Sequence, residues 1–216
     1  MSVPRILFAK VANMKWYDGI NENDKPVGGG SFVDDTGDAC EQFNFKRRRC
    51  EDGVEKCFGF FETKHLHGMR LGWNKDGRKK LNINKIGGCA NLGNVDFVND
   101  VLVVFCTTIK GTGIRVVGWY KHATVYRECQ GKSFGNEWQL YFVKTESKNA
   151  VLLPYQDRGL LKWEVPSAIR SGTGFGFGQS LYWFAQEKQG RDEANIRLRK
   201  FLNRMIEQIN EFDGGI

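Results

Sequence analysis

The sequence predicts an α+β protein built on a curved mixed or antiparallel β-sheet, with flanking helices and an amphipathic helix at its C-terminal end. β-Branched and aromatic residues dominate residues 101–128, and such side chains fit a pleated, half-buried surface. Candidate strands outnumber candidate helices and are not separated by regular helical crossovers, which excludes a doubly wound parallel sheet. Apolar residues recur from Leu198 to Phe212 at steps of four, three, four and three, the spacing of one helical face.

The N-terminal part of the chain predicts strands joined by loops. Residues 5–12 (RILFAKVA) form a first candidate strand, and a loop or single helical turn follows at residues 14–19. Residues 24–30 (DKPVGGG) are too rich in glycine for a regular element and predict a loop. Further strands are expected at residues 54–62 and at residues 81–86, where apolar and polar side chains alternate.

Residues 101–128 predict a buried hairpin. Gly111 and Gly113 permit the positive φ angles that a short reversal needs. We expect this hairpin to bring three rings to one end of the sheet, next to cationic side chains, and these rings are Trp119, Tyr120 and Tyr126. Aromatic faces beside cations suit a nucleic acid, because bases stack on the rings and phosphates pair with the cations.

The C-terminal part predicts two further strands, at residues 138–146 and 150–153. A second glycine-rich stretch at residues 171–178 lies before Gln179, and we expect one of the two glycine-rich loops to pass close to a bound ligand. The amphipathic helix is expected from about Glu193 to Phe212. The chain is therefore divided into a main domain at residues 1–190 and a helix at residues 191–216 that docks on that domain or on a partner.

Composition favours a polyanionic partner. The 216 residues hold 32 Lys and Arg against 25 Asp and Glu, which gives a formal charge of +7. No apolar run approaches the roughly 20 residues of a membrane span, so no membrane association is expected. The six cysteines are scattered, without a C-x-x-C pair or a secretory leader, which predicts reduced thiols in a cytoplasmic protein. Their spacing from His65 and His67 is unlike that of zinc sites, and the glycines lack the spacing of phosphate or dinucleotide loops, so neither metal nor cofactor is expected.

Several short motifs follow one another along the chain. They are Phe8-Ala9-Lys10, Met14-Lys15-Trp16-Tyr17-Asp18-Gly19, Gly28-Gly29-Gly30-Ser31-Phe32-Val33, Phe43-Asn44-Phe45, Val117-Gly118-Trp119-Tyr120-Lys121, Val125-Tyr126-Arg127 and Gly178-Gln179-Ser180. Their order resembles that of a group of prokaryotic domains that occur alone or at the N-terminus of modification-dependent restriction endonucleases. The central hairpin also resembles the EVE branch of the PUA-like superfamily, which implies a partial barrel. Relatives in that superfamily bind a modified base in an aromatic-lined pocket.

The resemblance and the residue types together give two sets of candidate binding residues. The base pocket is expected to combine stacking rings with polar groups that read the base edge, and its candidates are Trp16, Tyr17, Asp18, Ser31, Asn44, Trp119 and Tyr120. Basic side chains are expected to bind the phosphates of the flanking strands, and these candidates are Lys15, Arg47, Arg48, Arg49, Lys79, Lys80, Lys121 and Arg127.

The expected function is recognition of a modified base in DNA by base flipping, as part of a restriction or phage-defence system. No catalytic residue is expected, and a nuclease or translocase effector would be a separate domain or chain. Two alternatives remain open. Glu62 and Lys64 match half of a metal-dependent nuclease signature, and the stripe at residues 198–212 could instead make the protein an adaptor that binds a partner helix.

Overall fold

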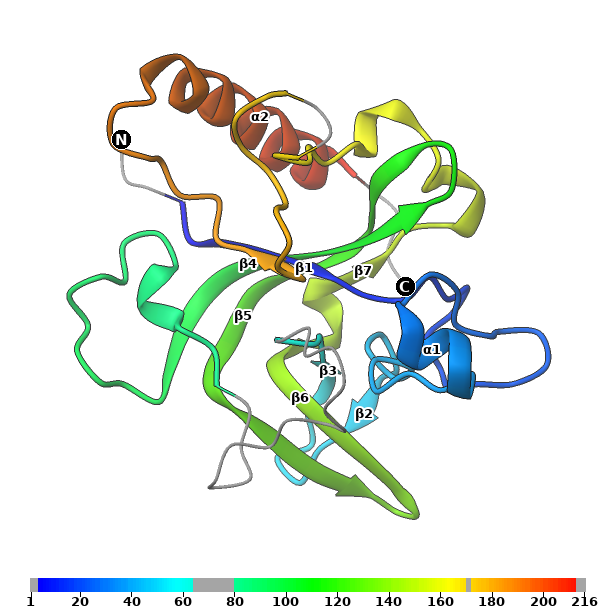
Figure 1. The fold of residues 1–216 in the computed structure, drawn as a ribbon. Helices are drawn as coiled ribbons and strands as arrows, with labels where there is room; N and C mark the ends of the chain where they lie inside the picture. The colour runs from blue at the N-terminus through cyan, green and yellow to red at the C-terminus, as the bar shows by residue number, and fades with distance from the viewer. Residues whose placement is uncertain (1–3, 64–79, 170–171, 213–216) are drawn as a thin grey trace.

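The computed structural model describes residues 4–63, 80–169 and 172–212, which form a mixed α+β fold dominated by one β-sheet (Figure 1). The strands are β1 (Ile6–Lys10), β2 (Arg48–Arg49), β3 (Glu55–Gly59), β4 (Phe97–Ile109), β5 (Gly113–Phe134), β6 (Glu137–Glu146), β7 (Ala150–Leu152) and β8 (Tyr182–Trp183). The helices are α1 (Ser31–Thr36) and α2 (Asp192–Glu211), with short 3-10 turns at Ile83–Lys85, Ser147–Asn149, Tyr155–Asp157 and Leu161–Trp163.

Neighbouring strands follow the order β2-β3-β6-β5-β4-β1-β8, and β7 pairs with β5 beside this path. β1 runs parallel to β4, whereas the other strand pairs are antiparallel. The sheet is open, because β2 and β8 lie at opposite ends of the path. The prediction of an α+β protein with a curved mixed sheet is confirmed at this level.

The long strand β5 connects the two halves of the sheet. Its pairing with β4 begins at the predicted turn, where Ile109 faces Gly113, and its pairing with β6 ends where Phe134 faces Glu137. Register shifts interrupt both pairings, and such β-bulges bend a strand. Figure 1 shows β5 passing from the layer beneath α2 into an arm that it forms with β6. The predicted hairpin therefore exists, but its second strand is much longer than the sequence indicated.

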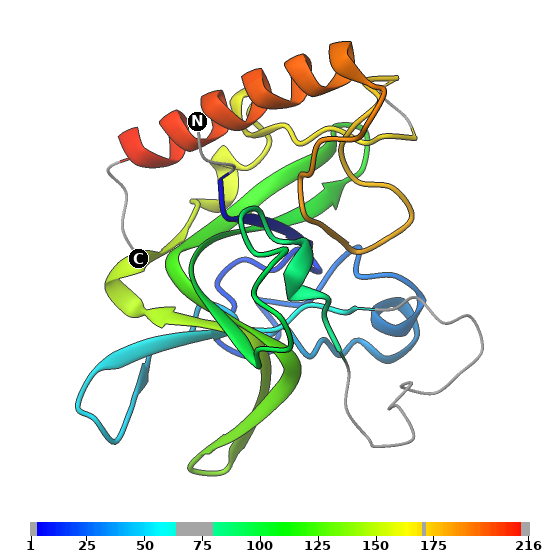
Figure 2. The same cartoon turned by 90° about the vertical axis from the view of Figure 1, so that its left-hand side faces the viewer.

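Two buried clusters lie on opposite faces of the sheet. The larger cluster contains Tyr120, Phe105 and Phe142, and it fills the concave side together with the loops at its edge. The smaller cluster contains Trp119 and Phe8, and α2 covers it (Figure 2). The central strands are thus buried on both faces, which explains why they read as nearly continuous apolar runs.

Helix α2 docks on the sheet of its own chain. Leu198, Leu202, Met205 and Ile209 are buried in the smaller cluster, as expected for the predicted apolar stripe. Because this stripe is covered, it does not offer a free surface to a partner helix, and the adaptor hypothesis loses its structural basis. Within the described residues, no helix is both long and apolar enough to cross a membrane.

The alternating segment at residues 81–86 is not a strand, contrary to the prediction. It holds the 3-10 turn Ile83–Lys85, and Leu81, Ile83 and Ile86 are all buried in the larger cluster. The apolar residues alternate because they close one edge of that cluster from a loop. Residues 64–79, which precede this segment in the chain, lie outside the described residues.

We predict that Gly118→Ala destabilises the fold. A Cβ atom at Gly118 would lie 2.3 Å from the carbonyl oxygen of Val151 and 2.7 Å from a ring carbon of Phe45. Such overpacking costs about 1–3 kcal/mol of unfolding free energy, which denaturant titration measures. Gly159→Ala is the matched control, because a Cβ there meets open space. Equal stability of the two variants would contradict this account of the packing between β5 and β7.

Candidate functional site

The structure does not assemble the predicted base pocket around Trp119 and Tyr120. Both side chains are fully buried, and they belong to the two clusters on opposite faces of β5. The Trp119 ring lies 5.4 Å from the ring of Trp163, whereas the Tyr120 ring lies 4.9 Å from that of Phe105. These two residues are core residues, and their assignment to one ligand pocket is corrected.

Tyr17 and Asn44 are also structural. The buried Tyr17 hydroxyl donates a hydrogen bond to the carbonyl oxygen of Ala12, and burial holds the pKa of this phenol above its usual value. The Asn44 side chain donates to the Phe60 carbonyl oxygen and accepts from the Phe60 N–H, both at 2.8 Å. Both Asn44 contacts stay within the protein, so the amide joins a loop to the end of β3 and is not directed at a ligand.

The remaining predicted pocket residues lie at the surface or outside the described side chains. Asp18 is exposed and forms an ion pair of 3.2 Å with Lys46. Ser31 is the first residue of α1, and its side chain lies outside the described part of the structure. Trp16 is 46% exposed, and the Nζ atom of Lys15 lies 4.2 Å from the centroid of its ring. Of the predicted rings, Trp16 is accessible to a stacking partner.

Two buried charged groups hold the loop that presents Trp16. The Asp24 carboxylate accepts hydrogen bonds from the N–H groups of Lys15, Trp16 and Tyr17, the last two at 2.8 and 3.1 Å. The Arg158 guanidinium donates to the carbonyl oxygens of Met14 and Lys15. This network fixes the loop even though Tyr17 has a φ angle of 56°, which non-glycine residues rarely adopt.

The predicted phosphate-binding residues divide into exposed and structural groups. Arg48 is 7% exposed and bonds to Glu137, and this hydrogen bond lowers the pKa of the Glu137 carboxyl. Arg127 donates to the Val95 carbonyl oxygen and to Asn84, and Lys80 pairs with Glu128 at 3.1 Å. Lys79 lies outside the described residues. Lys15, Arg47 and Arg49 are exposed, and Lys121 is partly exposed.

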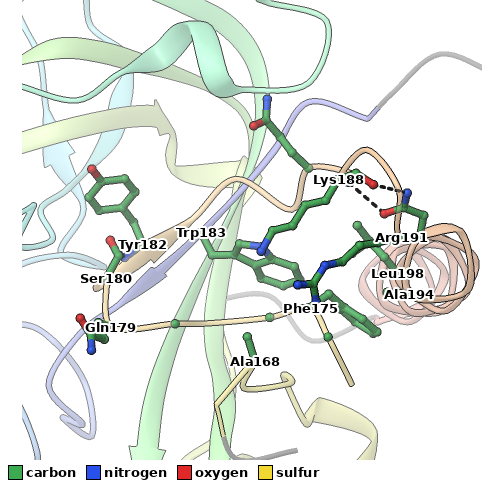
Figure 3. A pocket seen from close by; sticks show the side chains of 15 residues that line it. Ala168, Phe175, Gln179, Ser180, Tyr182, Trp183, Lys188, Arg191, Ala194 and Leu198 are labelled. Atoms are coloured by element: carbon green, nitrogen blue, oxygen red, sulfur yellow. Dashed lines mark hydrogen bonds between the residues drawn. The ribbon is translucent and has the colours of Figure 1, made fainter. Parts of the chain in front are cut away.

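A different pocket lies between the second glycine-rich loop and the start of α2. Its volume is about 260 Å³. Its walls come from the loop at residues 174–180, from β8, from the connection at residues 186–191 and from the first turns of α2. Figure 3 shows Arg191 and Lys188 reaching from the helix side toward the ring of Trp183.

The loop wall of this pocket depends on glycine. Gly176 has a φ angle of 113°, and a Cβ atom there would lie 2.1 Å from the carbonyl oxygen of Pro166. Gly174 has a φ angle of 78°, and its missing Cβ lets the loop pass close to Ala194 on α2. The glycine-rich composition therefore allows this loop to lie flat against its neighbours and leave the pocket open beside them.

The helix wall is fixed by one amide side chain. Asn195 accepts a hydrogen bond from the Lys188 N–H at 3.0 Å and donates to the Lys188 carbonyl oxygen at 2.8 Å (Figure 3). This reciprocal pair closes the connection onto the helix. It sets the positions of the Lys188 and Arg191 backbones relative to β8.

Chemically, the pocket combines aromatic rings with cations. The Trp183 ring is stacked on Phe8 at 5.0 Å and lies 6.3 Å from the ring of Phe175, so packing holds its plane in place. The fifteen lining residues include Lys188 and Arg191 and no acidic residue. Gln179, Ser180 and Gln186 add polar groups that can contact a ligand edge. The arrangement can bind a planar ring system that carries, or is attached to, negative charge.

The sequence contains a partial signal for this pocket. Its glycine-rich stretch was expected to be one of two loops that could approach a ligand, and the Gly178-Gln179-Ser180 motif was part of the resemblance. Trp183, Lys188 and Arg191 were not predicted as site residues. Lys188 and Arg191 look like ordinary surface residues in the sequence, because nothing in their spacing places them opposite Trp183.

Comparisons of the chain with protein-family models, with curated proteins and with solved structures found no match. The function is therefore inferred from the geometry of the pocket and from the sequence motifs. For the nuclease alternative, Lys64 lies outside the described residues. Across the described part of the chain, no three His, Cys, Asp or Glu side chains lie together as metal ligands would. Glu62 instead accepts a hydrogen bond from the N–H of Thr63.

We predict that Asp24→Ala lowers the free energy of unfolding by about 1–3 kcal/mol, because it leaves buried N–H groups without an acceptor. Asp18→Ala is the control from the same loop, since its exposed ion pair contributes only about 0–1 kcal/mol. Urea unfolding of the two variants measures the difference. A loss at Asp24 no larger than that at Asp18 would show that the carboxylate does not hold the Trp16 loop.

Proposed function

We propose that this protein is a DNA-binding specificity domain that recognises a modified base, extruded from the duplex, in the pocket between residues 174–180 and α2. The observation that carries the proposal is the Trp183 ring, held in place by Phe8 and approached from the helix side by Arg191 and Lys188. The exposed part of the Trp183 ring would provide the stacking surface, and the two cations would contact a phosphate or an electron-rich base edge.

The size of the pocket supports a single ring system as its ligand. Its volume of about 260 Å³ is just below the roughly 300–1,000 Å³ typical of sites for drug-sized molecules. One base with a small adduct matches a pocket of this volume. Ala168, Ala194 and Leu198 supply small or apolar lining, which can accept a methyl group.

Phosphate contacts must supplement stacking for base flipping to be favourable. Stacking contributes about 1–3 kcal/mol per base, and unstacking the duplex costs a few kcal/mol. The exposed side of α2 adds three further cations, namely Arg197, Lys200 and Arg204. Together with the net charge of +7, they can release counterions from the DNA backbone.

The motif resemblance supports the same function. Gly178, Gln179 and Ser180 belong to the motif series that resembles the prokaryotic reader domains, and they line the pocket. A PUA/EVE-like origin of the sheet is part of this proposal. The proposal also includes a cytoplasmic location and the absence of catalysis by this chain. An effector nuclease or translocase would be another domain or chain.

The test is a binding panel of matched DNA duplexes that carry methyladenine, methylcytosine, hydroxymethylcytosine or no mark. We expect one mark to bind tighter than the unmarked duplex, and Trp183→Ala to weaken that binding about 5- to 150-fold, the equivalent of losing one stacked base. Arg191→Gln should weaken it as well. Fluorescence anisotropy at a fixed salt concentration measures both effects.

Trp138→Ala is the matched control, because Trp138 is 63% exposed on the arm of β5 and β6, outside the pocket. It should leave the preference for the marked duplex unchanged. Equal affinity across the whole panel would refute modified-base recognition. A marked duplex that binds Trp183→Ala as tightly as the parent would place recognition elsewhere.

A further inference from the structure

A row of aromatic side chains crosses the lower part of the sheet. It consists of Phe97, Tyr126, Tyr141, Phe58 and Phe134, and is called the aromatic row below. Successive ring centroids lie 5.8, 5.8, 4.9 and 5.1 Å apart. The residues come from β4, β5, β6 and β3, so the row runs across the strands and not along one of them.

The aromatic row lies on the face opposite the larger buried cluster. Ala123 and Val125 of β5 belong to that cluster, and successive side chains of a strand point to opposite faces. Tyr126 therefore points away from the cluster, and it pairs directly with Phe97 on β4. Both views show the arm of β5 and β6 extending away from α2, so the helix that covers the upper part of the sheet does not reach this part (Figures 1 and 2).

The rings are partly accessible. Phe97 is 47% exposed, and Tyr126, Tyr141 and Phe134 are partly exposed, whereas Phe58 is buried beneath them. Partial burial raises the pKa of Tyr141 to about 12, which is consistent with a ring held partly within the sheet surface. Paired strands hold the rings in place, so little conformational entropy would be lost when a ligand binds them.

Cations accompany the aromatic row. The Nζ atom of Lys144 lies 5.3 Å from the Tyr126 ring centroid, and that of Lys132 lies 5.7 Å from the Phe134 centroid. Lys144 has no ion-pair partner among the described residues, and the carboxylate that pairs with Lys132 belongs to Glu51, whose side chain is 94% exposed. Both ammonium groups can therefore exchange their present contacts for a phosphate.

We propose that the aromatic row binds an unpaired stretch of single-stranded nucleic acid. Bases would stack on the exposed parts of the rings, and the phosphates between them would contact Lys144 and Lys132. An apolar protein segment would match the rings but would desolvate the two ammonium groups without a counter-charge. A neutral polysaccharide would match the rings and leave the cations unused. This proposal shares with the proposed function only its class of partner, a nucleic acid. The aromatic row and the pocket are separate surfaces.

The experiment uses a fluorescent, unmodified oligothymidylate and the whole 216-residue chain. We expect Lys144→Gln to weaken binding and to reduce the slope of log affinity against log salt by about 0.7, the value for one lost phosphate contact on a single strand. Replacing Tyr126 and Tyr141 together by alanine should weaken binding at least tenfold, because each stacked base contributes about 1–3 kcal/mol. Circular dichroism and thermal unfolding verify that the double variant folds, and Lys144→Gln tests the row without removing any ring.

Trp138→Ala is again the control. Trp138 faces Ser133 across the arm and covers Gly131, so it lies on the opposite side of the pleat from Lys132 and Phe134. Its loss should not change the affinity for oligothymidylate. The proposal would be refuted if both row variants bound oligothymidylate with the affinity and salt slope of the parent protein. It would also be refuted if the parent protein bound a soluble neutral β-glucan through Tyr126 and did not bind oligothymidylate.

The outcomes for the two surfaces can be separated. If Trp183→Ala removes the preference for a marked duplex while the row variants retain oligothymidylate binding, base recognition in the pocket is supported and single-strand binding by the aromatic row is refuted. If the row variants lose oligothymidylate binding while no mark is preferred in the duplex panel, the row stands and modified-base recognition is refuted.

Discussion

The bend of β5 is the constraint on which the rest of the structure depends. One strand pairs with β4 and β7 along its first part and with β6 along its last part, and its bulges turn the sheet between these pairings. The upper layer therefore has two faces to bury, one against α2 and one against the larger cluster. Beyond the bend, α2 no longer covers this face of the sheet, and the face carries the aromatic row. Both the pocket at the edge of α2 and the aromatic row beyond it follow from this geometry.

Local patterns predicted several of the elements but not the faces of β5. The turn glycines and the helical stripe correctly gave the hairpin start and α2, since both depend on short-range spacing. Val116, Val117, Trp119 and Tyr120 are all fully buried, so no polar residue marks which side is the core. The bulges then change the alternation without a signal in composition. For this reason Trp119 and Tyr120 were assigned to one pocket although they lie on opposite faces.

The basic residues show a similar limit. Arg47, Arg48 and Arg49 were all predicted to bind phosphate. Successive side chains of β2 point to opposite faces, so Arg48 turns inward to Glu137 while Arg49 remains exposed. Lys188 and Arg191 gained their position from the Asn195 contact, which joins residues seven apart and is not a recognisable motif. The glycine-rich loop was noticeable in the sequence because its composition itself is unusual. Side chains whose role depends on a tertiary contact could not be recognised from the sequence.

Helix α2 covers the smaller cluster and also supplies one wall of the pocket. Occupancy of the pocket and docking of the helix are therefore thermodynamically linked: a ligand that contacts both β8 and α2 favours the docked helix by RT ln(1 + [L]/Kd). The linkage is reciprocal, so any event that detaches α2 also lowers ligand affinity. The amide hydrogens of α2 would exchange with solvent more slowly in the bound state, and this makes the helix a reporter of what the pocket contains.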